Sequence, residues 1–81
     1  MSDEIPQHVQ TFPLSVVKSA TKLTARQIRY YEERGLINPN RNEGNQRVYS
    51  MDEIHQLKEV KLLIEQGINI AGIKKLMKKE F

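Results

Sequence analysis

Cationic and aromatic side chains gather in one short stretch, Thr24 to Leu36, which reads TARQIRYYEERGL. Arg26 and Arg29 are three residues apart, and Tyr30 follows directly. Residues three and four apart share a face of a helix, so these three side chains would project together. Guanidinium groups donate paired hydrogen bonds to phosphate and to guanine O6 and N7, and a phenol bonds phosphate or stacks on sugar. The stretch is therefore typical of a surface that contacts a polyanion.

A local structural role for the same arginines is the alternative. Arg29 could pair with Glu32 or Glu33 at helical spacing, a common surface arrangement worth about 0.3 kcal/mol. Arg26 has no acidic residue at those spacings. A groove contact is therefore favoured for Arg26 and, by a smaller margin, for Arg29, whereas Arg34 near the predicted helix end is interpreted as surface.

Catalytic and metal chemistry find little support in the sequence. The chain has no cysteine, which excludes disulfides and thiolate sites. Neither His8 nor His55 has a second histidine three or four residues away, as a zinc site on a helix would require. The adjacent Asp52 and Glu53 are explained by a helix start. We therefore expect no enzyme activity, no metal site and no cofactor.

Length and charge narrow the class of protein further. The 81 residues suffice for one small domain with a thin core. The chain starts without a signal-peptide pattern, and no apolar run approaches the ~20 residues that span a bilayer. A cytoplasmic location is therefore expected. Residues 18–49 carry seven Lys and Arg against three Glu, a local net charge of +4 that is typical of a polyanion partner.

Two helices are predicted to position the arginines. The first covers the stretch LSVVKSATKL, where apolar residues recur at helical spacing. The second begins near Ala25, because Thr24 and Gln27 form a capping box, and it ends at Gly35, which suits the positive φ after a helix. Such a pair, joined by a short turn, is a helix-turn-helix. The residues predicted to face the core from the second helix are Ile28, Tyr31 and Glu32.

A hairpin and two further helices are predicted to follow. Asn, Pro and Gly between residues 38 and 45 indicate a loop, and Val48-Tyr49 favours a strand, so the hairpin tip falls near residues 43–45. Ser50 and Glu53 form a second capping box, which starts a third helix at Met51. The fourth helix follows Asn69. The predicted apolar stripes of these helices are Ile54, Leu57, Val60, Leu63 and Ile64, then Ile70, Ile73, Leu76 and Met77.

The hairpin carries Arg41 and Arg47 on its two arms. Its flexible tip suits a contact with the DNA backbone or minor groove beside the second helix. Asn and Gly at the tip are explained by turn geometry, so only the two arginines bear on function. Residues 1–11 show no periodicity and are expected to form a flexible arm, with one domain over residues 12–81.

The run RYYEERGLINPNR, followed by a glycine, the segment RVYS and a capped helix, resembles the DNA-binding domain of MerR-type transcription regulators. The resemblance covers about residues 12–77. LTARQIRYYEERGLI with EGNQR and IEQGINIAGIKKL is similar to the nitrogen-regulatory branch of that family. It implies a mainly α winged helix-turn-helix fold, with four short helices and a small β-hairpin wing. It further implies a bacterial, nucleoid-associated regulator without catalysis.

The resemblance implies a repressor of nitrogen-assimilation genes, including glutamine synthetase, that binds double-stranded DNA at an inverted-repeat operator as a homodimer. By motif position, Tyr49 either touches phosphate or packs under the wing. The DNA-binding residues implied in this way are Thr24, Ala25, Arg26, Arg29, Tyr30, Arg41, Arg47 and Tyr49.

Two departures from the family pattern concern assembly and regulation. Most members continue into a long coiled-coil helix that forms the dimer, and this sequence stops at Phe81. The nitrogen-regulatory branch is expected to dimerise partly through its N-terminal segment, and it carries a C-terminal tail that responds to glutamine synthetase. We expect such a tail in the full-length protein, with glutamine synthetase as its partner. The apolar residues expected to take part in the dimer contact are Ile5, Val9, Phe12 and Leu14.

Two other classes of protein remain open. An architectural, excisionase-like protein with a similar winged domain would bend DNA and bind cooperatively along repeated sites. A protein-interaction module would use the lysine-rich fourth helix or the N-terminal arm and would bind DNA negligibly.

Overall fold

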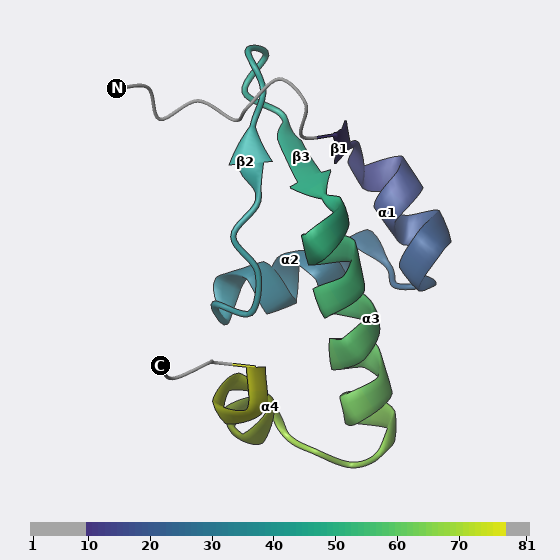
Figure 1. The fold of residues 1–81 in the computed structure, drawn as a ribbon, viewed down its shortest axis with the longest axis vertical. Helices are drawn as coiled ribbons and strands as arrows, with labels where there is room; N and C mark the ends of the chain where they lie inside the picture. The colour runs from purple at the N-terminus through teal and green to yellow at the C-terminus, as the bar shows by residue number, and fades with distance from the viewer. Residues whose placement is uncertain (1–9, 78–81) are drawn as a thin grey trace.

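The computed structural model describes residues 10–77 of the chain. Four helices lie beside and below a small antiparallel sheet in the view of Figure 1, which confirms the mainly α winged helix-turn-helix fold. In chain order the elements are β1 (Thr11–Phe12), α1 (Leu14–Thr21), α2 (Ala25–Glu33), β2 (Asn40–Arg41), β3 (Arg47–Ser50), α3 (Met51–Glu65) and α4 (Ile70–Met77).

The sheet has one strand more than the predicted hairpin. Its order is β1-β3-β2, so β3 lies between β2, the other arm of the wing, and β1 from the start of the chain. Thr11 pairs with Ser50, and Phe12 pairs with Tyr49. Within the predicted arm, Thr11 is therefore part of the sheet, because its backbone groups bond to β3. Gln10 belongs to no helix or strand, and residues 1–9 of the arm, including Ile5 and Val9, lie outside the described residues.

The helix starts agree with the local signals in the sequence. The Thr24 hydroxyl accepts from the Gln27 backbone N–H at 3.1 Å, and the Gln27 side chain accepts from the Thr24 N–H at 2.9 Å. Ser50 and Glu53 form the same reciprocal pair at 3.2 and 3.0 Å. Each box satisfies two backbone donors that a helix start leaves free. Gly35 has φ +83°, the left-handed conformation expected after α2.

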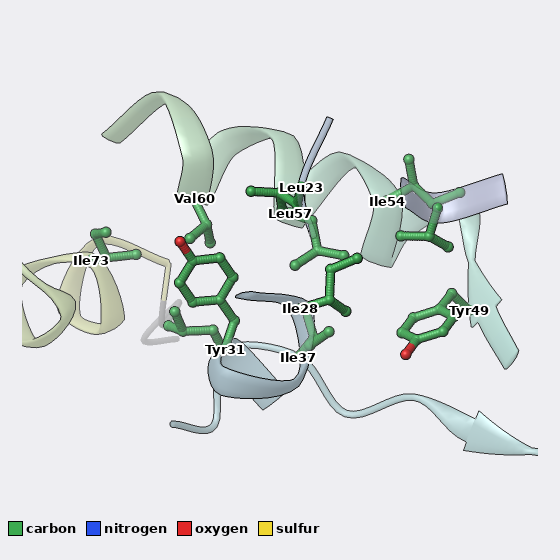
Figure 2. Packing of buried hydrophobic residues seen from close by; sticks show 11 residues of the cluster. Leu23, Ile28, Tyr31, Ile37, Tyr49, Ile54, Leu57, Val60 and Ile73 are labelled. Atoms are coloured by element: carbon green, nitrogen blue, oxygen red, sulfur yellow. The ribbon is translucent and has the colours of Figure 1, made fainter. Parts of the chain in front are cut away.

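The core lies between α3 and the other elements, as Figure 2 shows. Tyr49 of the sheet packs at one end of it, and Ile73 of α4 lies at the other. The predicted inner residues of α2, Ile28 and Tyr31, are both buried. The full set of buried apolar side chains is Val17, Leu23, Ile28, Tyr31, Leu36, Ile37, Tyr49, Ile54, Leu57, Val60 and Ile73.

Two residues of the predicted apolar stripes are exposed. Ile64 is 37% exposed and Leu76 is 60% exposed. Helical periodicity identifies the apolar face of a helix, but burial also needs a neighbouring element to cover it. The half-buried Leu63 packs against the core near the end of α3 instead, and Ile73 is the fully buried residue of α4.

The arrangement separates the wing from the C-terminal end of the domain. In Figure 1, β2 and β3 extend to the top of the molecule, α2 crosses below them, and α4 lies at the bottom. The molecule is flat, with extents of 39 × 32 × 20 Å. The wing and α2 are thereby placed so that a long, thin ligand could meet both.

Candidate nucleic-acid interface

The outer face of α2 carries three of the predicted contact residues. Arg26, Arg29 and Tyr30 are all exposed, and they line a shallow hollow of about 580 Å³ along the helix. Tyr30 is 46% exposed, and its ring centroid lies 5.8 Å from that of the buried Tyr31 at an interplanar angle of 58°. Such a tilted aromatic pair restrains the exposed ring. The helix therefore presents two guanidinium groups and the restrained phenol ring of Tyr30 on a common surface.

The start of α2 supplies backbone donors beside these side chains. Thr24 is exposed and Ala25 is half-buried. The Thr24 hydroxyl is already engaged in the capping box, which orients it along the helix start. The N-terminal end of a helix carries partial positive charge and free N–H groups, which favour an anion. Thr24 and Ala25 thus lie where a phosphate would be received, and their contact with DNA stays a prediction.

The two wing arginines lie directly opposite each other. Arg41 of β2 pairs with Arg47 of β3 in the antiparallel register, so their side chains share a face of the sheet. Like charges in directly opposite positions destabilise a strand pair. Arg41 Nη1 donates to the Asn45 carbonyl at 2.9 Å, and Arg47 Nε donates to Glu32 Oε1 at 2.7 Å. The wing therefore carries two neighbouring positive charges, and their repulsion destabilises the strand pair.

A second hollow joins the wing to the two helices. We call it the wing hollow, and its volume is about 470 Å³. It brings Arg29 of α2 together with Arg41 and Arg47 of the wing, which are far apart in the sequence. The residues that line the wing hollow are Pro13, Leu14, Ser15, Arg29, Arg41, Asn42, Asn45, Gln46, Arg47, Val48 and Tyr49. Three guanidinium groups around one concave surface form a site for an anion such as a phosphate group.

The ion pair between Arg47 and Glu32 was not predicted from the sequence. Helical spacing suggested Arg29 as the partner of Glu32, but among the described residues Glu32 pairs only with Arg47. The two partners are 15 residues apart in the chain and half-buried. The sequence did place Glu32 on the inner side of α2. A carboxylate that points inward needs a cationic or hydrogen-bonding partner, so a partner from outside the helix could have been predicted. The pair connects the helix to the wing.

Tyr49 is the one predicted DNA contact whose side chain faces the interior. It is fully buried, and its hydroxyl has no hydrogen-bond partner. Burial raises the pKa of the Tyr49 phenol above its ordinary value, with Glu32 acting in the same direction. Of the two roles open to Tyr49, the structure shows packing under the wing, because β3 directs alternate side chains to the core. Its contact with DNA stays a prediction, and the free protein holds its hydroxyl in the interior.

The residues predicted for a dimer contact divide into two groups. Phe12 and Leu14 are half-buried and pack against the core of their own chain. Ile5 and Val9 lie outside the described residues. Phe12 and Leu14 therefore have a packing role within the domain, and only their remaining exposed surface is available to a second copy.

No cluster of three or more His, Cys, Asp or Glu residues that could hold a metal ion occurs within residues 10–77. His55 is exposed on α3. Over the same part of the chain, no helix is sufficiently long and apolar to span a bilayer.

The fold and the basic surface define a winged helix-turn-helix protein, and comparison with known proteins identifies the family. The chain belongs to the MerR HTH family of regulatory proteins, whose model matches residues 12–80. This confirms the resemblance found in the motifs.

Individual relatives agree with the nitrogen-regulatory branch. The chain is 48% identical over 66 residues to the HTH-type transcriptional regulator GlnR of Bacillus anthracis, covering 82% of this chain and 51% of that protein. It is 40% identical over 67 residues to the HTH-type transcriptional regulator TnrA of Bacillus subtilis (strain 168), covering 83% and 61%. The chain thus spans about half the length of GlnR and somewhat more of TnrA.

Proposed function

We propose that this chain is the DNA-binding domain of a repressor of nitrogen-assimilation genes, including glutamine synthetase. The domain binds an inverted-repeat operator as a homodimer, with α2 in the major groove and the wing beside it. Phosphate contacts supply most of the affinity, and a few base contacts supply the choice of sequence. The repressor acts by occupying the operator and works in the bacterial cytoplasm on the nucleoid.

The observation that carries this proposal is the arginine content of two hollows, one along α2 and one at the wing, which share Arg29. Arg26, Arg29 and Tyr30 are exposed on the helix, and Arg41 and Arg47 face the wing hollow beside it. A surface that places guanidinium groups on both a helix and a hairpin suits a ligand with regularly spaced anions. The similarity to the transcriptional regulators GlnR and TnrA supports the same proposal.

The test is binding of this chain to a fluorescent glutamine-synthetase promoter duplex and to a scrambled duplex, over a series of salt concentrations. We expect the promoter to be preferred, and Arg26→Ala or Arg29→Ala to reduce that preference by about 1–3 kcal/mol. Lys75→Ala is the matched control, since it removes one exposed cation from α4, at the end of the molecule away from the wing (Figure 1). It should leave the preference unchanged.

The competing classes of protein give different results in the same experiment. In one outcome, both duplexes bind equally with a steep salt dependence, and both arginine variants reduce that dependence. The arginines would then contact only phosphate. The architectural reading would then lead, and a DNA-bending assay would establish it. Negligible binding to either duplex would favour a protein-interaction module.

The dimer contact is the second part of the proposal. Ile5 and Val9 of the N-terminal segment, together with the exposed remainder of Phe12 and Leu14, contribute apolar surface to it. Sedimentation of the chain with and without residues 1–9 tests this, and an unchanged association constant would reject a role for the segment. In the full-length protein we propose that a C-terminal tail senses glutamine synthetase.

A further inference from the structure

We infer that Glu32 is a positioning residue of the DNA-binding surface. Its carboxylate holds Arg47, and through Arg47 it sets the wing against α2. The inference rests on the proposed function, because it explains how the wing and the helix are kept at one spacing for a shared DNA ligand. Glu32 itself is not assigned a contact with DNA.

The geometry of the ion pair leaves Arg47 free to act on a ligand. Glu32 Oε1 accepts from Arg47 Nε at 2.7 Å. The other two guanidinium nitrogens form no hydrogen bond within the described residues, and Arg47 lines the wing hollow. A guanidinium group held at Nε has a fixed plane, so its two terminal nitrogens are directed rather than freely rotating. Such a group meets a phosphate with less entropy to lose.

The pair also connects two elements that have no other ionic link. Within residues 10–77 the remaining ion pair, Lys61 to Glu65, lies inside α3. Among these described residues, the pair of Glu32 and Arg47 is the only ion pair that joins α2 to the wing. The wing arms are short, with two residues in β2 and four in β3, so their own ladder fixes the wing angle weakly.

The repulsion between neighbouring arginines explains why the acidic residue Glu32 lies at the proposed DNA-binding surface. Arg41 and Arg47 lie directly opposite in the strand pair and repel each other. Glu32 offsets that repulsion in the free protein. For binding a polyanion, however, a nearby carboxylate is unfavourable on charge alone. If Glu32 acts only through its charge, its removal should raise the affinity for DNA. If Glu32 positions Arg47, its removal should lower that affinity.

The experiment uses this difference in sign. Operator and scrambled duplex are titrated with wild type, Glu32→Ala and Glu33→Ala. Glu33 is the matched control, because it carries the same charge at the next position of α2, is exposed and has no ion pair among the described residues. We expect Glu33→Ala to bind as tightly as wild type or more tightly. Glu32→Ala is expected to weaken operator binding about five- to tenfold, although it also removes a negative charge.

A double-variant cycle separates positioning from general destabilisation. Once Arg47→Ala has removed the held group, adding Glu32→Ala should cause no further loss of affinity. Thermal melts accompany every variant, and Glu32→Gln replaces Glu32→Ala if the alanine variant is unfolded at the assay temperature. Glu32→Gln keeps an acceptor near Nε without the charge, so an intermediate loss is expected.

Two results would overturn the inference. One is an unchanged or tighter operator complex with Glu32→Ala or Glu32→Gln, and the other is an additive loss in the double variant. The inference also has a readout without DNA, since nuclear relaxation of the wing amides should show larger motion in Glu32→Ala than in Glu33→Ala. If wild type itself fails to prefer the operator, the proposed function is rejected, and the relaxation experiment still decides the role of Glu32.

Discussion

At the scale of single residues, the hydroxyl of Tyr49 is an unusual feature of the core. It is the one buried side-chain polar atom without a hydrogen-bond partner among residues 10–77. A buried group of this kind costs free energy because it has lost water without gaining a partner. The ring, in contrast, fills one end of the core under the wing (Figure 2). The two parts of the same side chain therefore act in opposite directions on stability.

Replacement of Tyr49 by Phe should consequently leave the fold as stable as wild type or raise the free energy of unfolding by about 1 kcal/mol at neutral pH. Operator affinity should not change, because the side chain is buried. Urea unfolding and DNA titration of the same sample test both points. A drop in operator affinity at unchanged stability would show that the hydroxyl does reach phosphate in the complex.

The raised pKa of Tyr49 adds a prediction about alkaline conditions. Burial favours the neutral phenol in the folded state, so the unfolded chain releases the proton at a lower pH than the folded one. Below the ordinary tyrosine pKa of about 10 both states hold the proton, and the free energy of unfolding falls as the pH rises from there through the folded value. Melting temperatures should therefore fall less steeply above about pH 10 in Tyr49→Phe than in wild type. The pKa of the buried Tyr31 is also raised, and Tyr31 affects both proteins equally. The same pH dependence of the melting temperature in both proteins would therefore argue against a raised pKa of Tyr49.

At the scale of elements, local signals predicted the helices well because each signal is contained within a few neighbouring residues. The capping boxes at Thr24 and Ser50 lie where the sequence placed them. The third strand was not predicted, because two residues carry too little pattern and Thr11–Phe12 is defined by pairing with the distant β3. The contact between Glu32 and Arg47 was missed for the same reason. Local spacing made Arg29 the nearer partner of Glu32, whereas the fold brought Arg47 to it.

The capping box of α3 can be tested directly. Ser50→Ala removes the hydroxyl that accepts from the Glu53 N–H, so we expect the free energy of unfolding to fall by about 1 kcal/mol. Ser19→Ala is the control, because Ser19 is exposed within α1 and makes no hydrogen bond through its side chain in the described structure. It should be neutral or slightly stabilising. Equal effects of the two variants in chemical denaturation would contradict the capping role.

At the scale of the whole molecule, the flat shape and the placement of the wing suit one face of a duplex. Two copies bound to an inverted repeat must meet the same side of the DNA, so the centres of the half-sites should be one or two helical turns apart. Inserting about 5 base pairs between them should lower affinity at least tenfold, because one copy is rotated to the opposite side. An insertion of about 10 base pairs should restore much of the loss. Affinity that ignores the spacing would mean that the copies bind independently.

The direct junction between β3 and α3 limits how this domain can vary in length. Ser50 is both the last residue of the strand and the cap of the helix, and Met51 is already helical. An added residue at this point would rotate the apolar stripe of α3 by about 100° away from the core and bring polar side chains toward it, because helical residues are about 100° apart. The tip of the wing carries no core side chain, since residues 42–46 are exposed, but its turn is held by the Asn42 side chain, which accepts from the Gly44 and Gln46 N–H groups. An insertion at the junction should therefore disrupt the core, whereas an insertion at the tip should leave the core intact and change only the wing hollow.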